Sequence, residues 1–170
     1  MTNVFALRRY LRLLVLAMTV MTASSPAHSE SGRVWATAVS KNASNGRAII
    51  FRYIKNFQTE FHRSDYPDRV ILVWKYRSDS GMPSQAERQS MDRLEDLLSP
   101  VLEGPVLAAL VLVSTGENRR EWIYYAKSEQ AFMAVLNKAL TTQSRFPIEI
   151  HAAPDPAWTT YEDFRKGVRE

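Results

Sequence analysis

Residues 70–76 read VILVWKY and residues 107–113 read LAALVLV, and these two stretches decide the fold. Both are apolar without interruption over most of their length, and both are rich in β-branched and aliphatic side chains. A strand that is apolar on both faces suits the centre of a sheet that is covered on both sides. Further strands are predicted at residues 121–126, with Trp122 and Tyr124 on one face, and at residues 146–152, which alternate like a half-exposed edge strand.

Two helices are predicted between these strands, at residues 85–102 and 129–142, because their apolar side chains recur at helical spacing. Ser84 and Glu87 fit a capping box at the start of the first helix. The complete order over residues 69–152 is strand, helix, strand, strand, helix, strand. The sequence therefore predicts an α+β fold, a ferredoxin-like βαββαβ sandwich.

Two elements are expected to flank this unit. Residues 34–40 and 47–54 predict an N-terminal β-hairpin, because Asn45-Gly46 is a strong turn signal between them. Asp155-Pro156 predicts the N-cap and first residue of a short C-terminal helix with an aromatic face. Helices on one face of the sheet leave the other face to be covered by the hairpin and C-terminal helix, by a second subunit or by a ligand.

The first 29 residues have the pattern of a secretory signal peptide. They contain three arginines, an apolar run at residues 13–21 and small residues that allow cleavage after Ala27 or Ser29. A retained membrane anchor is the alternative, although the apolar run is short for a bilayer. We therefore expect an exported protein, periplasmic or secreted, with residues 30–170 as one domain and no stable membrane anchor after cleavage.

Charge and cysteine content narrow the class of protein. The chain has 22 basic and 18 acidic residues, and the predicted signal peptide contains three of the basic ones and no acidic one, leaving 19 against 18. A domain so close to neutrality gives no electrostatic reason to expect nucleic-acid binding. The absence of cysteine excludes disulfides, thiol catalysis and thiolate metal sites.

No catalytic motif is present, and we expect no cofactor and no metal. The chain contains no G-x-S-x-G elbow, phosphate-binding glycine loop or H-E-x-x-H motif. His62, Asp65 and Asp68 are interpreted as part of a polar connecting loop rather than as metal ligands. His151 beside Asp155 could form a histidine–carboxylate pair, and Arg119-Arg120 could hold an anion or simply lie in a solvated turn.

Large amphipathic aromatic side chains are the most suggestive feature. They either line one groove, where their polar groups would orient a ligand, or build the core. Together with His151 and Asp155, the candidate binding residues are Trp74, Tyr76, Trp122, Tyr124, Trp158 and Tyr161.

Several short motifs match a known family. They are YPDRVILVWKY at residues 66–76, GMPS at 81–84, LED at 94–96, EWIYY at 121–125 and DPAWTTY at 155–161. In these motifs the chain resembles the domain of unknown function 695 family, over about residues 51–164. The resemblance implies a ferredoxin-like α+β fold and no established reaction.

These observations favour an exported, non-catalytic binding or protein-interaction module. Its partner is expected to be a protein or a small molecule, and a homodimer is one possibility. The alternative is a cofactor-independent enzyme that acts on a small extracytoplasmic molecule. A hydrophilic pocket uniting His151, Asp155 and an arginine would favour the enzyme, whereas an exposed apolar sheet face would favour the protein partner.

Overall fold

The structure is a computed structural model that describes residues 32–104, 106–143 and 145–168. The predicted signal peptide, residues 1–29, lies outside the described residues. Within the part of the chain that is described, no helix is both long and apolar enough to cross a membrane.

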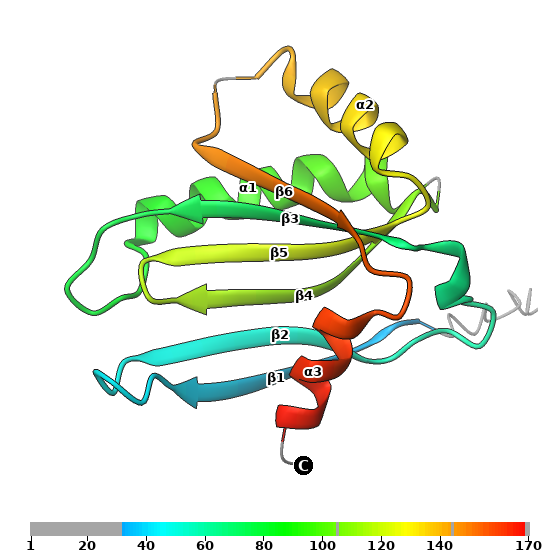
Figure 1. Ribbon diagram of the computed structural model, residues 1–170. Coiled ribbons are helices and arrows are strands. Elements are labelled where there is room, and N and C mark those ends of the chain that lie inside the picture. Colours follow the sequence, from blue (N-terminus) through cyan, green and yellow to red (C-terminus); the bar gives the residue numbers. More distant parts are fainter. Residues whose placement is uncertain (1–31, 105, 144, 169–170) are drawn as a thin grey trace, which may run out of the picture. The chain divides into compact units, whose positions relative to one another are not determined.

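One antiparallel sheet of six strands forms the centre of the described domain (Figure 1). Its strands lie in the order β1-β2-β4-β5-β3-β6. The predicted α+β class is confirmed. The elements are β1 (Val34–Lys41), β2 (Ala48–Asn56), the 3-10 turn η1 (Arg63–Asp65), β3 (Asp68–Lys75), α1 (Gln85–Leu102), β4 (Ala108–Gly116), β5 (Arg119–Ala126), α2 (Glu129–Leu140), β6 (Ile148–Pro154) and α3 (Thr159–Gly167).

Helix α1 begins where its capping box predicts. The Ser84 hydroxyl accepts from the backbone N–H of Glu87 at 3.2 Å, and the Glu87 carboxylate accepts from the backbone N–H of Ser84 at 2.8 Å. These two bonds satisfy donors that a helix start otherwise leaves unpaired. The capping box therefore fixes where α1 starts over the sheet.

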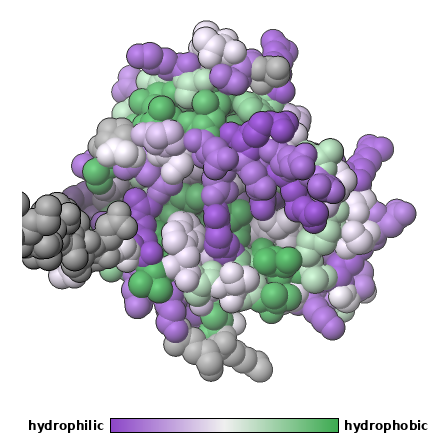
Figure 2. Space-filling view, turned by 180° about the vertical axis from the view of Figure 1, so that it is seen from behind, coloured by the Kyte–Doolittle hydropathy of each residue, from purple (hydrophilic) through white to green (hydrophobic). Residues whose placement is uncertain are grey.

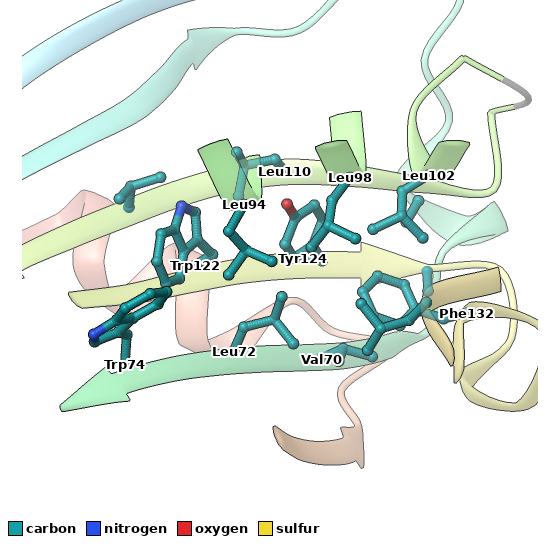
Figure 3. Packing of buried hydrophobic residues seen from close by; sticks show 14 of the residues in the cluster. Val70, Leu72, Trp74, Leu94, Leu98, Leu102, Leu110, Trp122, Tyr124 and Phe132 are labelled. Atoms are coloured by element: carbon teal, nitrogen blue, oxygen red, sulfur yellow. The ribbon is translucent and has the colours of Figure 1, made fainter. Parts of the chain in front are cut away.

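The sheet separates two hydrophobic cores. Helices α1 and α2 cover one face, and α3 lies on the other (Figure 1). In the first core, Leu94, Leu98 and Leu102 of α1 pack above the sheet, beside Trp122 and Tyr124 (Figure 3). Because side chains alternate along a strand, Ile123 and Tyr125 belong to the second core.

The second face is covered by α3 and by the connection between β2 and β3. Trp158 and Tyr161 are buried there with Tyr66, and Phe57 and Phe61 pack against them. The β1–β2 hairpin does not fold over this face. It extends the sheet beside β4, with Arg52 opposite Val113.

Helix α3 begins three residues later than predicted. It starts at Thr159, and its N-cap is Trp158 rather than Asp155. Residues 155–158 form a turn in which the Trp158 N–H donates to the Asp155 carbonyl at 2.9 Å. The Asp155 carboxylate still serves the helix, because it accepts from the N–H groups of Thr159 at 2.8 Å and Thr160 at 3.1 Å.

Candidate functional site

The aromatic candidates build the core, which is one of the two predicted alternatives, and do not line one groove. The structure places Trp74, Tyr76, Trp122 and Tyr124 in the core beneath α1 and α2, and Trp158 and Tyr161 in the core beneath α3. Each is at most 7% exposed. The groove hypothesis is wrong because alternate strand residues point to opposite faces of the sheet, which lies between the two groups.

Several of these aromatic residues bond through their polar groups to other parts of the protein. The indole N–H of Trp122 donates to Glu95 at 2.8 Å, and that of Trp158 donates to the Tyr66 carbonyl at 3.0 Å. The Tyr76 hydroxyl donates to the Gly81 carbonyl at 2.9 Å, and burial raises the pKa of Tyr76 to about 12. Those groups hold the core together, and they are not oriented toward a ligand.

His151 and Asp155 do not form the histidine–carboxylate pair that was one possibility, and His151 is instead a solvated residue of an edge strand. The His151 side chain is 62% exposed, and its Nε2 lies 3.8 Å from an oxygen of Glu149. Asp155 is buried beyond the end of β6 and accepts from the Tyr125 hydroxyl at 2.7 Å. The two side chains therefore have separate partners. They do not form a histidine–carboxylate pair that could act as a general base.

The other polar candidates are also separated. Arg119 lies 3.4 Å from Glu121, whereas Arg120 lies 2.9 Å from Asp92 of α1. The Asp68 carboxylate accepts from the first N–H of α2, that of Glu129, at 2.8 Å. Across the described residues, no group of three or more histidine, aspartate or glutamate side chains is placed to hold a metal ion.

The strongest candidate for a functional surface lies on the β1–β2 hairpin, on the same side of the sheet as α1. Three large apolar side chains are exposed there: Val39 at 66%, Ile50 at 41% and Trp35 at 37%. Thr37 and Arg52 alternate with them and are also exposed. We call these five residues the hairpin face.

The hairpin face is open because the sheet extends past its helices. The opposite side of the same strands is closed, since Phe51 and Tyr53 contact Phe164 of α3 at ring-centroid distances of 5.1 and 5.2 Å. In the part of the chain that the structure describes, no equivalent helix covers Trp35, Val39 and Ile50, which are exposed. In Figure 2, hydrophobic surface lies beside a band of hydrophilic side chains on this side of the molecule.

A groove of about 480 Å³ separates the hairpin face from α1. Two ion pairs bridge it, Arg52 with Glu95 and Arg120 with Asp92. Residues from five elements line it: Thr37, Ile50, Arg52, Val113, Thr115, Arg120, Asp92, Glu95 and Asp96. No histidine is among them, and four of the charged lining residues form these two ion pairs.

Fixed contacts hold the hairpin face in place. The Arg52 guanidinium lies 4.9 Å from the centre of the Trp35 ring and pairs with Glu95. Glu95 also accepts from Trp122 of the core, so the exposed indole is linked through two side chains to the centre of the domain. Such a preformed surface loses little conformational entropy when it binds.

Sequence reasoning missed this surface. The alternation of residues 34–40 correctly predicted a strand, but it gave no sign of which face would stay uncovered. A face that carries Trp35 and Val39 is normally predicted to be buried, because large apolar side chains usually are. Only the position of α1 shows that these residues are exposed.

Comparison with known proteins gives a family but no activity. A family model described as "Family of unknown function (DUF695)" matches residues 34–165, from the first residue of β1 into α3. No curated protein matches the chain. The matched region includes the whole hairpin face.

Proposed function

The chain belongs to the DUF695 family, whose function is unknown, and from its surface we propose that it is an exported, non-catalytic module that binds a partner protein through the hairpin face. The exposure of Trp35, Val39 and Ile50 together on one regular sheet surface carries this proposal. Single exposed apolar residues are ordinary, whereas a contiguous group of them marks interaction surfaces.

The composition of the hairpin face suits a protein partner. Tryptophan and arginine are enriched among the residues that dominate binding energy at protein interfaces, and here Arg52 lies against the Trp35 ring. The apolar residues adjoin a groove whose charges are paired. This arrangement of an apolar centre beside polar groups resembles a protein interface.

The enzyme alternative has less support. It requires a hydrophilic pocket that unites His151, Asp155 and an arginine, and the first two residues have different partners. The acidic side chains that line the groove beside α1 are Asp92, Glu95 and Asp96, and the first two of them are in ion pairs with arginines. An exposed apolar sheet face is the feature that favours a protein partner.

Photocrosslinking in intact cells tests the proposal. A photoreactive amino acid in place of Val39 should give a discrete crosslinked protein species, because this side chain is the most exposed apolar one of the hairpin face. The same probe in place of Lys138, an exposed residue of α2, is the matched control and should give none. Equal crosslinking at both positions, or none at Val39, would contradict the proposal.

A surface substitution provides the second measurement. Val39→Asp should weaken association with the crosslinked species by about tenfold or more, since it places a charge within an apolar contact. The thermal midpoint should stay close to that of the unmodified protein, because substitutions at exposed positions usually change stability little. Unchanged association would show that the hairpin face is not the binding surface.

A further inference from the structure

We infer that the partner of the hairpin is a second copy of this chain, which pairs its β1 with β1 antiparallel about Thr37. The inference rests on the proposed function, since it names the partner that the hairpin face binds. It joins two six-stranded sheets edge to edge into one continuous sheet.

Strand β1 is an edge strand without the usual protection. It pairs with β2 on one side, and none of the described residues pairs with its other side. Proteins commonly block such edges with proline, with charged residues or with a bulge. Strand β1 has eight residues and no proline, its only charge is Lys41 at its end, and its one irregularity lies between Val34 and Trp35.

The sequence of β1 is complementary to itself. Residues 35–39 read WATAV, which is nearly symmetric about Thr37. In an antiparallel pair centred there, Trp35 lies opposite Val39 of the second copy, Ala36 opposite Ala38, and Thr37 opposite its own equivalent. A two-fold interface requires this kind of self-complementarity, and aromatic–β-branched and Thr–Thr pairs are favourable across strands.

The pairing covers the two exposed side chains at the edge of the hairpin face. Trp35 and Val39 of each copy contact Val39 and Trp35 of the other, on the side of the sheet that carries α1. A register centred on Ala38 would instead place Lys41 opposite Trp35. A register shifted so that odd residues oppose even ones would pair side chains from different faces, which a continuous sheet does not allow.

The backbone groups of β1 are oriented for this pairing. The Asn42 N–H donates to the Arg47 carbonyl at 2.8 Å, next to the β1–β2 strand pair. Because hydrogen-bonded and non-hydrogen-bonded pairs alternate along an antiparallel ladder, Trp35, Thr37 and Val39 direct their N–H and C=O groups away from β2. These are the residues that the centre at Thr37 brings into hydrogen-bonded pairs.

On the α3 side, a second groove of about 810 Å³ reaches this edge. Ala36 and Ala38 form part of its floor, and Phe164 and Val168 line it from the α3 side. The C-terminal end of α3 lies over the edge of the hairpin in Figure 1. A second copy extends the floor of this groove with its own Ala36 and Ala38, so that small side chains meet beneath the two helices.

The pairing has a defined length. Beyond the central five residues, Lys41 would approach Arg33 of the second copy, and two like charges oppose each other unfavourably. Arg33 forms an ion pair with Glu103 in its own chain, which keeps its guanidinium occupied elsewhere. The interface therefore centres on residues 35–39 and does not extend along the whole hairpin.

Cysteine scanning of the exported protein tests the register. The chain contains no cysteine of its own, so any disulfide must come from the introduced residue. Thr37→Cys should give a covalent dimer on mild oxidation, since opposed residues of a hydrogen-bonded pair have Cα atoms about 5.5 Å apart, within the range of a disulfide. Val39→Cys alone should remain a monomer in denaturing electrophoresis without a reducing agent. A mixture of the Trp35→Cys variant and the Val39→Cys variant should form a covalent dimer. Crosslinking through Ala38→Cys instead of Thr37→Cys would overturn the register.

Mass measurement in solution tests the dimer itself. Light scattering or sedimentation should give twice the monomer mass at micromolar concentration, and Thr37→Lys should raise the dimer dissociation constant about tenfold or more by opposing two charges at the axis. Thr142→Lys, at an exposed position near the end of α2, is the matched control and should leave the mass unchanged.

The result separates this inference from the proposed function. A monomer at every concentration, without a Thr37→Cys dimer, overturns the pairing of β1 with β1. If the probe at Val39 then still traps a different protein, the binding module stands and only its partner is wrong. If the probe at Val39 traps neither a second copy of the chain nor another protein, both the pairing of β1 and the proposed function are wrong.

Discussion

Trp158 connects more of the structure than any other single side chain described. Its ring stacks on Tyr125 at a centroid distance of 3.9 Å, and its indole N–H lies within hydrogen-bonding distance of the carbonyls of Arg63 and Tyr66. Its backbone has φ of 56°, a left-handed conformation that is unfavourable for a residue with a side chain. Such a conformation persists only where surrounding contacts enforce it, and the stacking and hydrogen bonds supply those contacts.

Replacing this side chain should destabilise the domain strongly. We expect Trp158→Ala to lower the free energy of unfolding by about 3–5 kcal/mol, as for other buried aromatic residues. Trp158→Phe should lower it by about 1–3 kcal/mol, because it keeps the ring but leaves carbonyl groups without their donor. Urea unfolding measures both. An unchanged midpoint for Trp158→Ala would mean that the residue has no structural role.

The sequence predicted that the aromatic residues of the C-terminal helix are buried, but it did not predict which groups they contact. Trp158, Tyr161 and Phe164 recur at helical spacing, and that spacing correctly predicted a face packed against the body of the domain. It could not show that the Trp158 indole bonds to carbonyls more than 90 positions earlier. Likewise, nothing in the local pattern distinguished exposed Trp35 from buried Trp122, because the difference depends on which strands α1 covers.

At the scale of elements, α3 is held to the sheet by a buried carboxylate. Asp155 accepts from the Tyr125 hydroxyl of β5 and from the first two N–H groups of α3. Burial would raise the pKa of Asp155, but these hydrogen bonds outweigh it and lower the pKa to about 2. Charged Asp155 therefore stabilises both the start of α3 and its contact with the sheet.

This carboxylate should make stability depend on pH in the acid range. The pKa is about 3.9 in an unfolded chain and about 2 in the folded one. A lowered folded pKa contributes stability that is complete above the unfolded value and is lost as pH falls from about 4 toward 2. The difference corresponds to a contribution on the order of 2 kcal/mol.

Asp155→Asn isolates this contribution. At pH 7 it should lower the free energy of unfolding by about 2 kcal/mol, and the decrease in stability between about pH 4 and pH 2 should become shallower. Asp163→Asn is the control, because that carboxylate is 63% exposed and pairs only with Lys166 at the surface. Parallel pH profiles for Asp155→Asn and the unmodified protein would rule out the proposed role of the carboxylate.

The two helix starts show what local sequence can and cannot predict. The Ser84–Glu87 capping box is a local arrangement with a known geometry, and α1 begins directly after Ser84, at Gln85. Asp155-Pro156 carried an equally clear signal, yet α3 begins only at Thr159. Here the Asp155 carboxylate also accepts a hydrogen bond from Tyr125, 30 positions earlier. The local sequence signal could not predict this tertiary contact, and the helix start that it predicted is wrong.

At the scale of the molecule, the sheet is wider than its helices. Six strands lie side by side, but the core beneath α1 and α2 is built on the four that belong to the βαββαβ unit. Among the described residues, a helix packs on only one face of the added hairpin, and α1 reaches its other face through the Arg52–Glu95 ion pair. Periodicity predicted every strand of this sheet. It could not predict the uncovered face, because exposure there depends on which strands the described helices cover rather than on any property of residues 34–56.

The final prediction concerns the form in which this domain reaches its site of action. We expect residues 1–29 to be removed on export, because three arginines, a short apolar run and small residues follow one another as in a signal peptide. Intact mass spectrometry of the exported protein should give a chain that begins near Glu30. Removal matters for the hairpin face, since β1 starts at Val34 and would otherwise follow the apolar run at residues 13–21 after only twelve residues. A full-length mass in the membrane fraction would mean that the chain stays anchored, and pairing of β1 with β1 would then have to occur at the membrane surface.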